Sequence, residues 1–153
     1  GWGQGSDGHN VAISHPEGRG LNRAMTQALK DAKISAPDID YVNAHAPSTS
    51  IGDASELKAL KSVFSLPQEV MISSTKALTG HGLSLSSIME ASFCCLALKN
   101  GFLPGSAHVT DPDPEIGHLR LLRKTEQTQA KRILSNSSGF GGANVSVIFE
   151  QAD

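Results

Sequence analysis

The chain has 153 residues, of which 39% are hydrophobic, and a formal net charge of -2 at pH 7. This length and composition predict one domain with a single core. A charge so close to neutral argues against a nucleic-acid-binding protein, which usually carries a basic patch. The most apolar stretch, 88–98, contains Glu90 and is too short to cross a bilayer, so we expect no membrane span.

The start of the chain and its cysteines give two further expectations. The sequence begins at Gly1, with no Met start and no signal-peptide pattern, so we expect it to begin inside a longer protein or to be an engineered segment of one. Its two cysteines, Cys94 and Cys95, are adjacent and cannot build an ordinary disulfide framework. This pattern predicts a reducing, cytoplasmic location.

The first third of the chain predicts a loop, a helix and a strand. Residues 1–16 are rich in glycine and predict irregular structure. From residue 17 apolar residues recur at the spacing of one helix face, and this helix must end before Pro37. The predicted face consists of Leu21, Ala24, Met25, Ala28, Leu29 and Ala32. Residues 39–43 then alternate in polarity, which is typical of a strand.

The middle of the chain predicts a second helix, a second strand and a buried helix. Asp53 and Glu56 resemble a capping box, so Asp53 is the predicted N-cap of the second helix. Its apolar stripe consists of Ala54, Leu57, Leu60 and Phe64. Residues 70–72 begin a strand, and the segment 83–99 is apolar nearly all round, which predicts a buried helix.

The last third predicts a mixed sheet. Prolines at 104, 112 and 114 indicate an extended loop, and residues 119–123 a weak strand. Residues 132–136 and 145–149 flank a glycine-rich turn and predict an antiparallel pair of strands. Helices and strands that alternate before a closing strand pair predict a layered α/β fold with a mixed sheet.

Two histidines lie just after predicted strand ends, where open α/β sheets place their ligand sites. His45 follows the strand 39–43. Instead of a catalytic role, it could have a structural one, as a histidine that hydrogen-bonds a neighbouring loop. His81 is predicted to open the buried helix, whose positive N-terminal end suits a developing anion. Its alternative is a polar residue that only begins the helix.

A lysine and a glutamate form a predicted pair near the second histidine. Glu90 lies in the predicted buried helix, so its carboxylate needs a partner, and Lys76 is the natural candidate. A purely structural ion pair is equally compatible with this pattern. Two histidines, a lysine and a glycine turn at strand ends are typical of acyl-transfer or decarboxylation sites, although no convincing nucleophile accompanies them.

The glycine turn, the cysteines and the remaining histidines add little chemistry. Gly139-Phe140-Gly141-Gly142 could expose a backbone N–H, or could be an ordinary hairpin. Cys94 and Cys95 fall in the predicted buried helix, where cysteine usually acts as a small hydrophobe. The six histidines show no HxH, HExxH or CxxC spacing, so we expect no metal site.

Together, the polar segments resemble the C-terminal half of β-ketoacyl-[acyl carrier protein] synthases, the condensing enzymes of fatty-acid and polyketide synthesis. The segment from His45 to Asp53 is similar to the family pattern His-Gly-Thr-x-Thr-x-x-Gly-Asp. Lys76 followed by Gly80-His81, and the segment 136–144, match two further family motifs. Gly3, Ser6, Asp7 and Gly8 also resemble the segment that enters this half.

This resemblance implies a thiolase-like α/β fold, in which residues 1–153 are the C-terminal domain with a mixed sheet covered by helices. The nucleophilic cysteine would belong to the absent N-terminal half. The intact enzyme would catalyse decarboxylative Claisen condensation of an acyl thioester with malonyl carrier protein. The implied partners are an acyl carrier protein, the N-terminal half, and a second subunit in a homodimer or ketosynthase heterodimer.

The resemblance also implies catalytic roles for individual residues. His45 and His81 would hydrogen-bond the malonyl thioester oxygen and stabilise the enolate. Lys76 with Glu90 would hold the charge and geometry of the site. Phe140 would gate acyl entry, and its N–H would assist the thioester oxyanion.

The implied substrate contacts come from Thr49, Gly139 and Gly141. Thr49 would hydrogen-bond the phosphopantetheine arm, which arrives on the carrier protein, so no resident cofactor is expected. Ala46-Pro47 replaces the family's Gly-Thr and loses one pantetheine-binding hydroxyl and one backbone donor.

The sequence departs from the family motifs at two further places, and two alternative functions remain open. Residues 84–87 read Ser-Leu-Ser-Ser where the family has Gly-Ala-Ala-Gly, and Ser138 replaces a frequent Phe.

The first alternative function is a non-catalytic, chain-length-factor-like partner subunit, which would usually lose some of the histidines and the lysine. The second is a thiolase, whose second reactive cysteine near the C-terminus has no counterpart after Cys95.

Overall fold

The structure is a computed structural model, and it describes residues 1–67 and 69–152. A six-stranded mixed sheet forms its central layer, in the order β1-β8-β7-β2-β3-β5. The strands are β1 (Trp2–Ser6), β2 (Tyr41–Asn43), β3 (Met71–Ser73), β5 (Arg120–Leu121), β7 (Arg132–Gly139) and β8 (Ala143–Glu150). β2 is parallel to β3 and β7, and β3 to β5, whereas β8 is antiparallel to β7 and β1.

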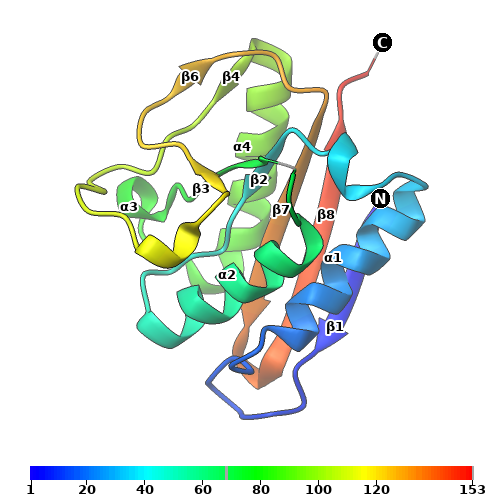
Figure 1. Cartoon of the computed structure of the whole chain (residues 1–153), viewed down its shortest axis with the longest axis vertical. Helices are drawn as coiled ribbons and strands as arrows, with labels where there is room; N and C mark the ends of the chain where they lie inside the picture. The colour runs from blue at the N-terminus through cyan, green and yellow to red at the C-terminus, as the bar shows by residue number, and fades with distance from the viewer. Residues whose placement is uncertain (68, 153) are drawn as a thin grey trace.

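Helices cover both faces of this sheet. The α-helices are α1 (Arg19–Ala32), α2 (Ser50–Val63), the short α3 (Lys76–Thr79) and α4 (Ser86–Asn100). α1 and α2 lie on one face and α4 on the other (Figure 1). β4 (Phe102–Leu103) and β6 (Glu126–Gln127) form a separate small sheet. The predicted α/β class, the mixed sheet and the antiparallel strand pair near the C-terminus are therefore confirmed.

The core divides between the two faces because strand residues alternate in direction. Val42 and Leu134 pack with Leu60 in the cluster on the α1 and α2 side. Tyr41 and Ile133 belong to the cluster on the α4 side. This arrangement places the end of β2 between both helical layers.

The prediction of irregular structure for residues 1–16 was wrong for residues 2–6, which form a strand, and is confirmed for residues 7–16, which contain no helix or strand. Trp2–Ser6 forms β1 at the sheet edge, paired with β8. Gly3 and Gly5 alternate along β1 and face α1, and a Cβ on Gly5 would lie only 2.1 Å from Gly20 O. These glycines let the helix pack directly on the strand backbone, which composition alone cannot distinguish from a loop.

Replacing Gly5 with alanine should therefore lower the unfolding free energy by about 1–3 kcal/mol, because the new methyl group forces α1 away from β1. Urea unfolding of the intact protein measures this change. Gln4→Ala is the matched control, since Gln4 is exposed on the same strand. Equal losses in both variants would contradict this account of the helix–strand contact.

The second helix begins earlier than predicted. Thr49 is its N-cap and Asp53 lies in its first turn, where its carboxylate accepts a hydrogen bond from Ser48 N at 3.1 Å. Asp53 is therefore not the cap. Of the predicted stripe, Leu60 and Phe64 are buried and Leu57 packs against the core, whereas Ala54 is exposed. The buried residues of this helix are Ser55, Glu56, Ala59 and Leu60.

The predicted buried helix, 83–99, is buried on one face only. α4 begins at Ser86 and packs against β7, but Ile88 is 62% and Leu96 49% exposed. No part of the described chain covers Ile88 and Leu96, so the helix is apolar nearly all round but leaves one apolar face exposed. No helix within the described ranges is long and apolar enough to cross a membrane.

Candidate active site

Three polar segments lie at one edge of the sheet, because β2, β3 and β7 run parallel. β2 ends at Asn43, opposite Ser135, and β7 continues past this point to Gly139. His45 follows β2, Lys76 begins α3 after β3, and Gly139 ends β7. The sequence predicted strand ends as the place of the site, and the structure brings these ends together.

A cleft of about 750 Å³ opens at this edge. The predicted site residues that line it are His45, Thr49, His81, Gly139 and Phe140. The imidazole rings of His45 and His81 meet edge to face, with centroids 5.2 Å apart and planes at 79°. At this separation both rings can approach one oxygen atom placed between them. A second cleft shares Thr49 and His81 and adds Lys76.

His45 is held as a neutral ring. It is 8% exposed, and its Nδ1 is buried without a hydrogen-bond partner in the described residues. Burial, together with the charge of Lys76 and the neighbouring His81, lowers the pKa of His45 to about 3. A neutral imidazole keeps one N–H, so His45 can donate a hydrogen bond to a ligand at neutral pH.

This lowered pKa predicts an acid-dependent loss of stability. The unfolded chain binds a proton on His45 near pH 6.5, whereas the folded protein does so only near pH 3. Above pH 6.5 the His45 ring is neutral in both states. As the pH falls below 6.5, the unfolded chain gains a proton on His45 that the folded protein does not, so the free energy of unfolding decreases. Between pH 6 and 4 the intact protein should lose about 1.4 kcal/mol per pH unit more than His45→Gln. Urea unfolding at several pH values measures both slopes, and equal slopes would contradict a buried neutral ring.

Glu56 is a site residue that the sequence analysis missed. Its carboxylate is buried on α2 and accepts hydrogen bonds from His45 N at 3.0 Å and Ala46 N at 2.7 Å. Asn136 Nδ2 on β7 donates to the same carboxylate at 3.1 Å. Burial raises the pKa of Glu56, while these hydrogen bonds oppose the shift. Glu56 therefore fixes the backbone that carries His45, between α2 and β7.

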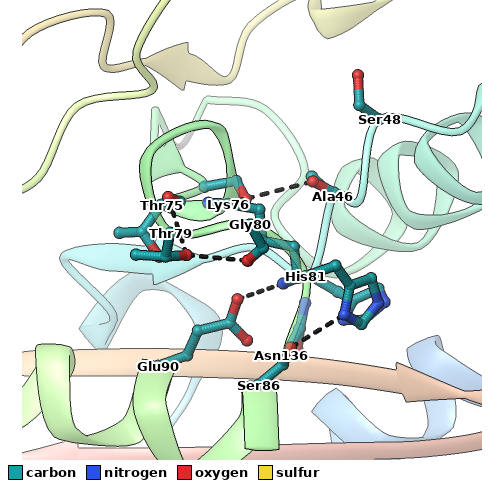
Figure 2. A network of polar contacts seen from close by, with 12 residues as sticks. Ala46, Ser48, Thr75, Lys76, Thr79, Gly80, His81, Ser86, Glu90 and Asn136 are labelled. Carbon is teal, nitrogen blue, oxygen red and sulfur yellow. Dashed lines mark hydrogen bonds and ion pairs between the residues drawn. The ribbon is translucent and has the colours of Figure 1, made fainter. Parts of the chain in front are cut away.

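Lys76 and Glu90 form the predicted ion pair, from α3 to α4 (Figure 2). Lys76 is 8% exposed and Glu90 fully buried. Burial raises the pKa of Glu90, and the hydrogen bond from Lys76 opposes that shift. Lys76 lines the second cleft. Glu90 lines neither cleft and contacts the site only through its ion pair with Lys76.

His81 does not begin α4 as predicted. It lies in the turn between α3 and a 3₁₀ segment, Leu83–Leu85, and α4 starts only at Ser86. Two contacts orient its ring: Leu83 N donates to Nδ1 at 3.1 Å, and Ser86 Oγ lies 3.0 Å from the same atom. The ring is therefore fixed by local hydrogen bonds, and the helix-dipole argument does not apply in the form that the sequence suggested.

The glycine turn lies at the mouth of the cleft. Phe140 is 77% exposed and follows Gly139, while Gly141 has φ 78 and needs the left-handed region that glycine favours. Gly141 N donates to Val11 O at 2.7 Å, so this N–H is already used within the chain. The substrate contact predicted for Gly141 would have to come from another atom.

The cysteines lie apart from this cleft, on α4. Cys94 is buried against Tyr41 and neighbours, and burial raises its thiol pKa to about 12, so it cannot serve as a nucleophile. Cys95 is exposed and also free. Within residues 1–67 and 69–152 no group of His, Cys, Asp and Glu side chains could hold a metal ion.

Comparisons with known sequences agree on one family. The family described as "Beta-ketoacyl synthase, C-terminal domain" matches residues 1–110. A 3-oxoacyl-[acyl-carrier-protein] synthase 2 from Staphylococcus aureus is 36% identical over 151 residues, which are 98% of this chain and 38% of the relative. The mitochondrial 3-oxoacyl-[acyl-carrier-protein] synthase of Arabidopsis thaliana is 40% identical, over 97% of this chain and 33% of the relative. The chain thus spans well under half the length of these relatives.

Solved structures share the fold. A β-ketoacyl synthase from Burkholderia phymatum superimposes with a TM-score of 0.92 at 34% identity, over 100% of this chain and 37% of that one. A ketosynthase in complex with its chain length factor, from Xenorhabdus doucetiae, superimposes with a TM-score of 0.89 at 35% identity, over 99% of this chain and 38% of that one. A type II polyketide ketosynthase in complex with its acyl-carrier protein superimposes with a TM-score of 0.93 at 27% identity, over 99% of this chain and 38% of that one.

Proposed function

The chain belongs to the β-ketoacyl synthase family, as its C-terminal domain, and from this membership we propose that it supplies the decarboxylating side of a condensing enzyme. The intact protein would join an acyl thioester to malonyl carrier protein in fatty-acid or polyketide synthesis. The observation that carries the proposal is the pair of imidazole rings, 5.2 Å apart, that face one cleft.

The two histidines stabilise the enolate that forms when the malonyl group loses carbon dioxide. The bond to the carboxylate carbon breaks, carbon dioxide leaves, and the electron pair moves onto the thioester oxygen. Donors already aimed at that oxygen stabilise the charge as it develops. The neutral ring of His45 and the oriented ring of His81 offer two such donors. The resulting carbanion then attacks the acyl thioester.

The remaining site residues position the substrates. Lys76, paired with Glu90, places a positive charge beside the histidines. Thr49 lies in both clefts, where a phosphopantetheine arm delivered by the carrier protein would pass. Phe140 is exposed at the cleft mouth, where it can gate the acyl chain and direct its N–H toward the thioester.

The acyl-accepting thiol comes from another part of the protein in this proposal. Cys94 is disqualified by its burial and raised pKa, and Cys95 lies outside both clefts. The half-open face of α4, with Ile88 and Leu96 exposed, supports a partner domain that packs there. The free, adjacent cysteines also support a reducing, cytoplasmic setting.

The experiment uses the full-length protein with two separate assays. The first loads a radiolabelled acyl group from acyl carrier protein, and the second follows carbon dioxide release from malonyl carrier protein. An active condensing enzyme should form a covalent acyl-protein and release carbon dioxide. Neither product would point to the alternative, a non-catalytic partner subunit, which the retained Lys76, His45 and His81 argue against.

The isolated 153-residue chain should self-associate, because the exposed apolar face of α4 has lost its cover. Light scattering after size-exclusion chromatography measures the mass in solution. Ile88→Asp combined with Leu96→Gln should shift the chain toward the monomer. The matched control Lys30→Gln changes an exposed residue of α1 and should leave the mass unchanged. A monomeric wild-type chain would contradict a missing partner domain.

A further inference from the structure

Ser86 is a buried serine in the first turn of α4, and its hydroxyl touches the ring of His81 (Figure 2). The residue is 2% exposed, and Oγ lies 3.0 Å from His81 Nδ1. The described part of the chain offers this hydroxyl no other hydrogen bond. A buried hydroxyl needs such a partner, so the contact with His81 accounts for a serine at this position.

The direction of this hydrogen bond follows from a second contact. Leu83 N also approaches His81 Nδ1, at 3.1 Å, and a backbone N–H can only donate. Nδ1 must then accept, so the Ser86 hydroxyl donates as well. Since Nδ1 accepts, the ring proton lies on Nε2, which makes Nε2–H the donor available to a ligand.

Ser86 links His81 to the same helix that holds the lysine. Ser86 and Glu90 are one helical turn apart on α4, both are buried, and Glu90 pairs with Lys76. Leu83, in contrast, begins the short 3₁₀ segment, is 69% exposed and has a φ of 52°, an uncommon backbone conformation for leucine. The hydroxyl of Ser86 is thus the contact that ties the ring to a packed element.

We propose that Ser86 is a positioning residue, which holds the ring of His81 so that Nε2–H points at the oxygen that becomes the enolate. The proposal rests on the function proposed above, in which His81 donates to that oxygen. It assigns a role in catalysis to a serine in the segment 84–87, where the sequence departs from the family pattern. Ser86 acts through His81 and does not itself touch the substrate.

The test measures malonyl decarboxylation by the full-length enzyme with Ser86→Ala. The turnover number should fall about three- to tenfold, the effect of one lost hydrogen bond, while KM and acyl loading stay unchanged. Alanine is a good helix former, so α4 should persist. Ser92→Ala is the matched control, because the Ser92 hydroxyl bonds Ile88 O within the same helix, and it should keep the wild-type rate.

A double-variant cycle with His81→Ala separates positioning from a general structural effect. If Ser86 acts through His81, Ser86→Ala should cost nothing further once His81 is absent. An equal loss in both backgrounds, or no loss in the single variant, would overturn the proposal. If His81→Ala itself keeps the wild-type rate, the proposed function of His81 fails instead, so the two failures are distinguishable.

Discussion

His81→Ala in the intact protein should lower the rate of malonyl decarboxylation by about 10²–10³, the usual effect of losing one oxyanion donor. His81 lines the cleft, with its ring centroid 5.2 Å from that of His45, so its removal takes away one of the two imidazole donors beside the developing charge. Acyl loading should change far less, because that step depends on the thiolate and on backbone donors near Phe140.

The two half-reactions must be followed separately for this prediction. Radiolabelled acyl transfer reports loading, and carbon dioxide release from malonyl carrier protein reports decarboxylation. His9→Ala is the matched control, since His9 is exposed and lines neither cleft. An unaltered decarboxylation rate in His81→Ala would show that His81 is only a structural residue of the turn before α4.

The sequence predicted the elements and contacts that depend on local pattern. The family resemblance, drawn from three polar segments, is confirmed, as is the meeting of those segments at the ends of β2, β3 and β7. The pairing of Lys76 with Glu90 was also predictable, because a carboxylate inside an apolar helix needs a positive partner.

The failures have a common physical cause, which is that partners distant in sequence decide the structure. Glu56 appeared only as part of a capping box, yet it is buried because it binds the backbone of His45 and the amide of Asn136. The glycines of β1 suggested a loop until α1 supplied the surface against which they pack. Glu56 lies one turn before buried Leu60, and that spacing was the available signal.

The buried ion pair gives the largest expected effect on stability. Lys76→Met leaves the Glu90 carboxylate buried without a counter-charge, since the side chain of Glu90 is only 1% exposed. The intact protein should then lose about 3–5 kcal/mol of unfolding free energy. Lys76→Met combined with Glu90→Gln removes both charges and should recover most of this loss. Urea unfolding of the three proteins measures the difference.

An exposed pair provides the control for this experiment. Lys58 and Glu17 also form an ion pair, at 2.7 Å, but their side chains are 52% and 58% exposed, so Lys58→Met should change stability little. A Lys76→Met protein as stable as wild type would contradict a buried, coupled pair. The double variant then separates structure from chemistry. If it is stable but releases carbon dioxide from malonyl carrier protein slowly, the charge of Lys76 serves the reaction, because the fold then persists without the ion pair.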